Sequence, residues 1–174
     1  MHWIKGLVML LLATVGGAAE EFRLESVGVR FGYSANHRTG DLHEADAVAA
    51  WNLPWVWKPT DHWRLQTGLE ISAGGIFAPG PDAFVGRAGP TFVLRRVPFP
   101  VALDLGCIPT VLSRREIGHT DFGCQFQFTS HAGLNWDIGS HFRLGYRLQH
   151  MSDAGLTDHN PGLNLHMFSA SYRF

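Results

Sequence analysis

Apolar and polar residues alternate along most of the chain after its first twenty residues, with the two-residue period of a β-strand. In the stretch FRLGYRLQ, residues 142–149, every second residue is aromatic or leucine, and the residues between them are arginine, glycine or glutamine. The pattern predicts strands at approximately 23–34, 44–57, 62–77, 83–96, 100–112, 121–138, 141–152 and 163–174. Gly, Pro, Asn and Asp separate these runs, and no convincing amphipathic helix or domain boundary interrupts them. We therefore expect an all-β domain of about eight antiparallel strands.

The two faces of these strands differ in chemistry. One face is aromatic and aliphatic, and in segment 121–138 it holds Phe122, Cys124, Phe126 and Phe128. The opposite face carries Arg30, Arg64, Glu70, Arg87, Asp104, Gln125, Gln127, Arg143 and Arg147. A soluble barrel buries its apolar face, whereas a membrane barrel turns that face to lipid and keeps the polar residues inside. The interior of an eight-stranded barrel is narrow, so we expect the inward charges to pair with one another.

Three features favour the membrane barrel over a soluble ligand-binding barrel, the alternative. The expected strands are long enough to cross a bilayer at a tilt. Aromatic residues gather around alternate turns, like the interfacial belt of membrane proteins; they are Trp55, Trp57, Trp63, Phe99, Trp136 and Phe142. The last strand carries Phe168, Ala170, Tyr172 and Phe174 on one face and ends on Phe174, which resembles the C-terminal assembly signal of bacterial outer-membrane proteins.

The N-terminal segment MHWIKGLVMLLLATVGGAA predicts a secretory signal peptide at residues 1–19, because Lys5 precedes a short apolar run and then small residues. The alternative, a membrane anchor, needs a longer run. Residues 20–174 then form one barrel domain. The net charge of −1 gives no basic bias, so nucleic acid is not an expected partner. In an exported protein, Cys107 and Cys124 either form a disulfide or remain free thiols.

His150 and Ser152 close the seventh expected strand. Outer-membrane barrels normally start and end on the periplasmic side, so this strand ends at the external surface, and parity places both residues on its lipid-facing row. Polar groups that face lipid are costly unless they have partners, which makes them candidates for function. Residues two apart on a strand share a face about 7 Å apart, and a histidine there can take the serine proton as the oxygen attacks a carbonyl. We therefore expect the target to be an acyl ester of a lipid.

The stretch HMSDAGLTDHNPGLN, residues 150–164, resembles the H-x-S-N-A-G…N-x-G signature of the PagL lipid A 3-O-deacylases, also called acyloxyacyl hydrolases. The resemblance implies a small outer-membrane barrel with a Ser-His-Glu triad on its outer surface and no cofactor. It assigns Ser152 as the nucleophile and His150 as the general base. It also assigns Gly155 and Asn160 to the oxyanion hole, whose donors stabilise the negative oxygen of the tetrahedral intermediate.

Two positions depart from the family pattern. Asp153 stands where the family commonly has asparagine, and Asn164 stands at the position of the family's glutamate. Asn164 lies on the outward face of the strand that is expected to pair with His150. Its carbonyl can accept the imidazole N–H, as in Cys-His-Asn proteases, but it carries no charge to stabilise imidazolium. Asp153 and Asp158 are the alternative acids, although parity turns Asp153 to the other face.

Other side chains change this picture little. His150, His159 and His166 lie near one another in sequence, but their spacing matches no strong zinc pattern, and we expect no metal. Three arginines lie in the expected external loops: Arg38, Arg114 and Arg115. Such side chains are either solvated charges or contacts for the phosphates of lipid A.

The sequence therefore predicts an outer-membrane esterase that hydrolyses the 3-O-linked acyl chain of lipid A, a lipopolysaccharide component of the outer leaflet, by Ser-His catalysis. The alternative is a barrel of the same fold that has lost the acid and serves a structural or surface-binding role. Asn164 separates the two, because a side chain that holds His150 favours the enzyme and one that turns away favours the alternative. The sequence leaves open which acyl chain is removed and whether the barrel forms a homodimer.

Overall fold

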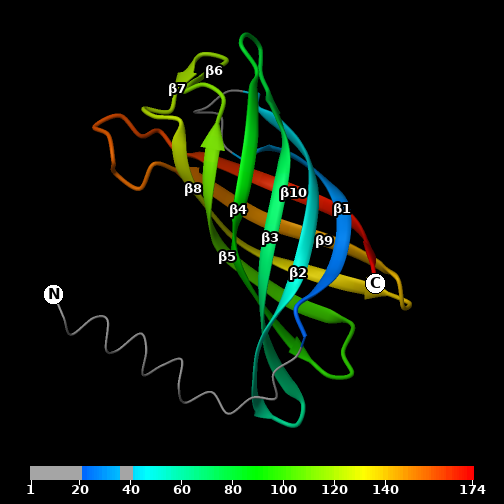
Figure 1. The fold of residues 1–174 in the computed structure, drawn as a ribbon. Coiled ribbons are helices and arrows are strands. Elements are labelled where there is room, and N and C mark those ends of the chain that lie inside the picture. Colours follow the sequence, from blue (N-terminus) through cyan, green and yellow to red (C-terminus); the bar gives the residue numbers. More distant parts are fainter. Residues whose placement is uncertain (1–20, 36–40) are drawn as a thin grey trace, which may run out of the picture.

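The computed structural model describes residues 21–35 and 41–174. Its strands are β1 (Arg23–Ser34), β2 (His43–Thr60), β3 (Trp63–Phe77), β4 (Ala83–Arg96), β5 (Val101–Leu112), β6 (Glu116–Ile117), β7 (Thr120–Asp121), β8 (Phe126–Ile138), β9 (Phe142–Ser152) and β10 (Leu163–Arg173). The eight long strands form one closed antiparallel barrel in the order β1-β10-β9-β8-β5-β4-β3-β2, and β6 and β7 form a separate hairpin (Figure 1). This confirms the expected all-β barrel.

The described residues contain no helix long and apolar enough to cross a membrane. The expected signal peptide, residues 1–19, and Arg38 lie outside the described residues.

Strands β1 and β10 close the barrel in a register that aligns their apolar rows. Val29 pairs with Ala170, and the next residue, Arg30, pairs with Ser169. Val29 is 62% exposed, whereas Arg30 is only 5% exposed. A shift of one residue would turn every side chain of the strand to the other face, so this register keeps the outside apolar and the inside polar. The barrel therefore has the apolar exterior and polar interior expected of a membrane barrel, which is the reverse of a soluble one.

The inward charges form a paired network. Arg30 donates hydrogen bonds to Asp46 at 2.9 Å and to Glu70 at 2.6 Å. Arg87 donates to Glu44 at 2.8 Å and to Asp46 at 3.0 Å. A buried charge without a partner costs several kcal/mol, and these pairs supply the partners. The expected pairing is confirmed, and it depends on Glu44 and Asp46, two residues that the sequence pattern did not single out.

The expected aromatic belt lies on the outer surface. Trp55 is 53% exposed, Trp136 is 55% exposed and Phe142 is 62% exposed. These residues lie near the β2–β3 and β8–β9 turns, which are at the same end of the barrel as the C-terminus (Figure 1). This end is therefore the periplasmic one in the usual orientation of outer-membrane barrels, and the β9–β10 connection lies at the opposite, external end.

The segment before β8 differs from the sequence expectation. We expected a strand from residue 121 with Phe122 facing lipid, but β8 begins at Phe126, and Phe122 is 0% exposed. Phe122 packs with Ile117 of the β6–β7 hairpin in the apolar cluster at the external end of the barrel. The extended backbone is interrupted at Gly123, whose φ is +78°, a value that glycine adopts without steric cost. Phe122 therefore lies in a buried apolar cluster instead of the lipid-facing row.

Gln125 and Cys124 also lie in the segment before β8. Gln125 does not point into the barrel as expected; it is exposed, and its side-chain amide donates to the carbonyl of Ser113 at 2.8 Å. Cys107 and Cys124 are both free, so the disulfide alternative is wrong for this structure. The Cys124 thiol instead donates to the carbonyl of Phe126 at 2.9 Å.

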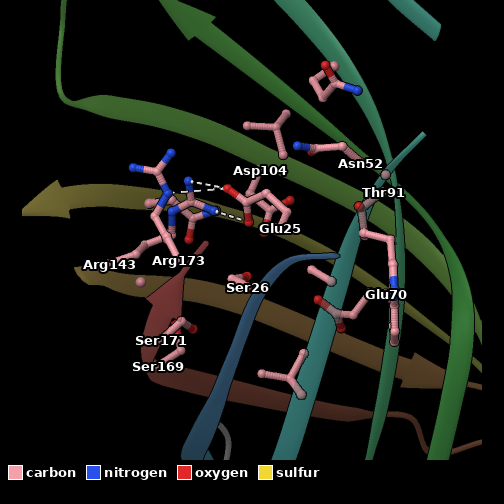
Figure 2. Close-up of a pocket in the computed structure, with 18 of the residues that line it drawn as sticks. Glu25, Ser26, Asn52, Glu70, Thr91, Asp104, Arg143, Ser169, Ser171 and Arg173 are labelled. Atoms are coloured by element: carbon pink, nitrogen blue, oxygen red, sulfur yellow. Dashed lines mark hydrogen bonds and ion pairs between the residues drawn. The ribbon is translucent and has the colours of Figure 1, made fainter. Parts of the chain in front are cut away.

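A polar cavity of about 330 Å³ occupies the periplasmic half of the interior, and Phe174 is one of its lining residues. Figure 2 shows Glu25, Arg143 and Arg173 gathered on one side of it. Glu25 accepts hydrogen bonds from Arg143 at 3.0 Å and from Arg173 at 3.3 Å. The cavity therefore lies at the other end of the barrel from His150 and Ser152.

Candidate active site

His150 and Ser152 lie on the outer surface at the external end of β9. His150 is exposed and Ser152 is half-buried. Antiparallel pairing places His150 opposite Asn164 on β10 and opposite Ser130 on β8. His150 continues the outward row of Leu148, which is 51% exposed. The strand parity expected from the sequence therefore holds, and the two polar residues face outward just above an apolar, lipid-facing surface.

Asn164 holds the imidazole of His150. The Oδ1 atom of Asn164 lies 2.7 Å from the Nδ1 atom of His150. Because a carbonyl oxygen only accepts, the proton sits on Nδ1, which leaves Nε2 with a free lone pair. This is the tautomer that a general base needs.

The Ser152 hydroxyl makes no hydrogen bond among residues 21–35 and 41–174. The structure therefore brings His150 and Ser152 onto one face without joining them directly. In ligand-free enzymes, catalytic hydrogen bonds are often long and tighten only when substrate binds.

Gly162 makes room for the His150 ring. A Cβ atom at Gly162 would lie 3.0 Å from Cε1 and 3.7 Å from Nε2 of His150. Its φ of +65° also favours glycine. The first contact is tighter than ordinary van der Waals distance, so any larger residue would press on the ring. Gly162 is the glycine of the N-x-G part of the sequence signature, a signal that could have identified it as a site residue.

The loop between β9 and β10 begins with a tight turn. The N–H of Leu156 donates to the carbonyl of Asp153 at 3.2 Å, and the two central residues, Ala154 and Gly155, have φ values of 56° and 81°. A non-glycine residue in this left-handed region costs about 1–2 kcal/mol. Strain of this size persists only where the surroundings hold it, and it concentrates at functional sites.

The Asp153 carboxylate organises this loop from within. It accepts hydrogen bonds from the N–H of Gly155 at 2.8 Å, the N–H of Thr157 at 2.9 Å and the hydroxyl of Thr157 at 2.5 Å. The bond from the Thr157 hydroxyl contributes most to lowering the pKa of Asp153 below its ordinary value, so the group stays ionised near neutral pH. The N–H of Asp153 donates to Oδ1 of Asn160 at 3.4 Å.

These contacts show which of the side chains considered from the sequence are hydrogen-bonded to His150. Asp153 turns into its own loop, as parity predicts, and its hydrogen bonds go to Gly155 and Thr157 rather than to His150. Asp158 is an exposed loop residue. Among the described residues, Asn164 is the side chain that hydrogen-bonds to the His150 imidazole.

The other polar residues near the site serve different contacts. The Tyr146 hydroxyl lies 2.8 Å from Nδ1 of His166, and the His166 ring packs on Tyr33 with centroids 5.3 Å apart. No group of three or more His, Cys, Asp or Glu side chains that could hold a metal occurs within the described residues. Arg115 directly precedes the β6–β7 hairpin, called here the external hairpin. Its side chain is 57% exposed, and the nearest carboxylate oxygen, on Glu116, is 3.6 Å away.

Comparison with known proteins identifies the family. The family model described as "Lipid A 3-O-deacylase (PagL)" matches residues 45–173. The protein named "Lipid A deacylase PagL" of Bordetella bronchiseptica (strain ATCC BAA-588 / NCTC 13252 / RB50) is 33% identical over 181 residues, which cover 97% of this chain and 94% of that protein.

A solved structure shows the same fold. The crystal structure of the outer membrane enzyme PagL superposes with a TM-score of 0.73 at 18% identity and covers 84% of this chain and 97% of that chain. The crystal structure of Neisserial surface protein A gives a TM-score of 0.47 at 12% identity and covers 88% of this chain and 97% of that chain. Because the family model matches most of the barrel and the Bordetella relative aligns over nearly the whole chain, this chain belongs to the lipid A 3-O-deacylase (PagL) family of outer-membrane β-barrel enzymes.

Proposed function

We propose that this protein hydrolyses the 3-O-linked acyl ester of lipid A, with Ser152 as nucleophile and His150 as general base. The observation that carries the proposal is the 2.7 Å contact between Asn164 and His150, beside Ser152, on the outer surface of the barrel. An orienting acceptor, an imidazole and a serine in this order form the arrangement that activates a hydroxyl in serine hydrolases. Their position at the external end matches an ester held in the outer leaflet.

The reaction follows from the proton positions. His150 Nε2 takes the proton of Ser152 as Oγ bonds to the ester carbonyl carbon, which gives a tetrahedral oxyanion. The intermediate collapses, the C–O bond of the ester breaks, and the sugar oxygen leaves with the proton from His150. Water then attacks the acyl-enzyme, again with His150 as base, and releases the fatty acid and free Ser152. No cofactor enters this scheme.

Asn164 supplies orientation without charge. Its carbonyl holds the proton of His150 on Nδ1, which keeps Nε2 available in every cycle. A carboxylate at this position would also stabilise the imidazolium that forms when His150 takes the serine proton. We therefore propose that Asn164 acts as the third member of the triad and that it supports a lower rate than a carboxylate would.

Gly155 and Asn160 are the proposed oxyanion donors. Asn160 accepts from the N–H of Asp153 through Oδ1, which leaves its Nδ2 hydrogens for an oxyanion. The N–H of Gly155 donates to Asp153 in the ligand-free protein. Donation by Gly155 to the oxyanion therefore requires that this bond opens or is shared when substrate binds.

The absence of a carboxylate at position 164 is the observation that favours a second candidate, a barrel without catalytic activity that serves a structural or surface-binding role. This candidate predicts that the contact between Asn164 and His150 is only a structural remnant, and that Ser152 is no more reactive than any other serine.

A serine-directed fluorophosphonate separates the two candidates. An activated serine attacks phosphorus, fluoride leaves, and the protein gains the phosphonyl mass. We expect the purified, folded barrel to be labelled once at Ser152, and we expect Ser152→Ala and His150→Ala to remain unlabelled. Peptide mass spectrometry locates the adduct. If the folded wild type gains no adduct, or carries it on a different serine, the proposed role of Ser152 is wrong.

A further inference from the structure

The loop that follows Ser152 is in contact with the hairpin segment between β5 and β8. A Cβ atom at Gly123 would overlap both Oγ1 of Thr157 and the carbonyl oxygen of His159. Separations below about 3 Å are far inside van der Waals contact, so only a glycine fits here. The φ of +78° at Gly123 disfavours larger residues for a second, independent reason.

Thr157 is the point at which this contact meets the loop's own hydrogen bonds. Its hydroxyl donates to Asp153 at 2.5 Å and also lies 2.9 Å from the carbonyl of His159. Its N–H donates to the same Asp153 carboxylate at 2.9 Å. Asp153 directly follows Ser152. A shift of the Thr157 side chain would therefore move the Asp153 carboxylate, and with it the residue next to the proposed nucleophile.

The segment around Gly123 is itself fixed to the barrel. The N–H of Gly123 donates to the side chain of Asp121 at 2.9 Å. Gln127, a buried residue of β8, donates to the carbonyls of Phe122 at 3.1 Å and Cys124 at 2.8 Å. Phe122 is buried in the apolar cluster at the external end. The contact surface that Gly123 presents to Thr157 is therefore part of the rigid scaffold rather than a second free loop.

We propose that Thr157 is a positioning residue, seated against Gly123, that sets the conformation of residues 153–162 and so aligns Ser152 and the oxyanion donors Gly155 and Asn160. The inference rests on the proposed function for its catalytic consequence, while its structural consequence holds independently of activity. It assigns Asp153 a structural role, because the carboxylate links Thr157 to the turn instead of orienting His150.

The first test uses paired variants in the purified full-length barrel. Gly123→Ala and Thr157→Val should each lower kcat for lipid A by about a hundredfold, the size expected when a site shifts by about 1 Å, with little change in KM. Thr157→Ser keeps the hydroxyl and should retain kcat within about threefold. Gly139→Ala is the matched control, because Gly139 also has a positive φ of 61° but a Cβ atom there would meet nothing within 4 Å.

Because the two changes disturb one contact, their effects should not add. The double variant Gly123→Ala/Thr157→Val should be no slower than the slower single variant, whereas independent sites would multiply their losses. Unchanged kcat in both single variants, or fully multiplicative losses, would overturn the proposal.

A second readout separates this inference from the proposed function. Hydrogen exchange of the Gly155 and Thr157 amides should accelerate in Gly123→Ala and in Thr157→Val but not in Gly139→Ala, whether or not the protein hydrolyses lipid A. Unaltered exchange at these amides overturns the positioning role. A wild type that neither turns over nor labels at Ser152, but shows the accelerated exchange in the variants, overturns the proposed function alone.

Discussion

The pairing of His150 with a neutral side chain is the feature of the site that most affects its expected rate. Asn164 accepts the Nδ1 proton at 2.7 Å and so fixes the tautomer, but the imidazolium formed in the proposed reaction would meet no opposing charge from this partner. We predict that Asn164→Glu raises kcat tenfold or more, because a nearby carboxylate stabilises the charged imidazole. Asn164→Ala should lower kcat about fivefold through loss of one hydrogen bond, worth about 1 kcal/mol.

Steady-state kinetics on lipid A in detergent micelles measures both effects. The matched control is His166→Ala, because His166 is on the same outward face of β10 and is bonded to Tyr146 rather than to His150. Equal kcat values for the wild type, Asn164→Glu and Asn164→Ala would show that Asn164 has no part in the reaction.

The sequence pattern predicts the polar residues of the site but not the glycines that make room for them. The positions of His150, Ser152 and Asn164 on one outward face follow from strand parity and from pairing of the last two strands, and both predictions hold. Gly162 and Gly123 act by leaving space for side chains that are distant in the chain or that approach from another strand. Alternation of polar and apolar residues contains no information about such contacts between loops.

At the scale of the elements, the barrel depends on charges that the strands bury together. Arg87 has a side-chain exposure of 0% and contacts Glu44 and Asp46 at 2.8 Å and 3.0 Å. We predict that Arg87→Met lowers the free energy of unfolding by about 3–5 kcal/mol, because it leaves buried carboxylates without one of their partners. Urea unfolding in detergent micelles, followed by tryptophan fluorescence, measures the change.

The control for this prediction is Arg115→Met in the external hairpin. Arg115 is 57% exposed, and its contacts with Glu116 and Asp121 measure 3.6 Å and 3.8 Å. Exposed pairs of this kind contribute about 0–1 kcal/mol. Similar losses for Arg87→Met and Arg115→Met would contradict the structural role assigned to the interior network.

The strands themselves were predicted well where alternation and the barrel agree. Seven of the eight expected segments begin and end close to observed strands, because each has one lipid-facing and one interior row. The segment at 121–138 failed at its start, since its apolar alternation continues through Phe122 and Cys124 although the chain there is no longer a strand. The Phe122 side chain leaves water equally well when it is buried against the β6–β7 hairpin or when it faces lipid. The apolar pattern alone therefore does not distinguish a buried loop residue from a lipid-facing strand residue.

At the scale of the whole molecule, the barrel places a polar site next to a lipid-facing surface. The apolar exterior and the aromatic belt set the depth of the protein in the membrane, with the C-terminus at the periplasmic end (Figure 1). The external end of β9 then lies at the level of the outer leaflet, and His150 and Ser152 face outward from it. In the proposed reaction, the acyl ester reaches these residues from the bilayer without entering the barrel.

The most direct test of this account is mass spectrometry of lipid A from bacterial cells that express either the wild type or Ser152→Ala at equal levels in the outer membrane. We predict that lipid A loses the mass of one hydroxyacyl chain with the wild type and is unchanged with Ser152→Ala. That result would establish deacylation by Ser152 and make Asn164 a working replacement for a carboxylate. Lipid A that is identical in both strains, with both proteins folded in the outer membrane, would contradict the account.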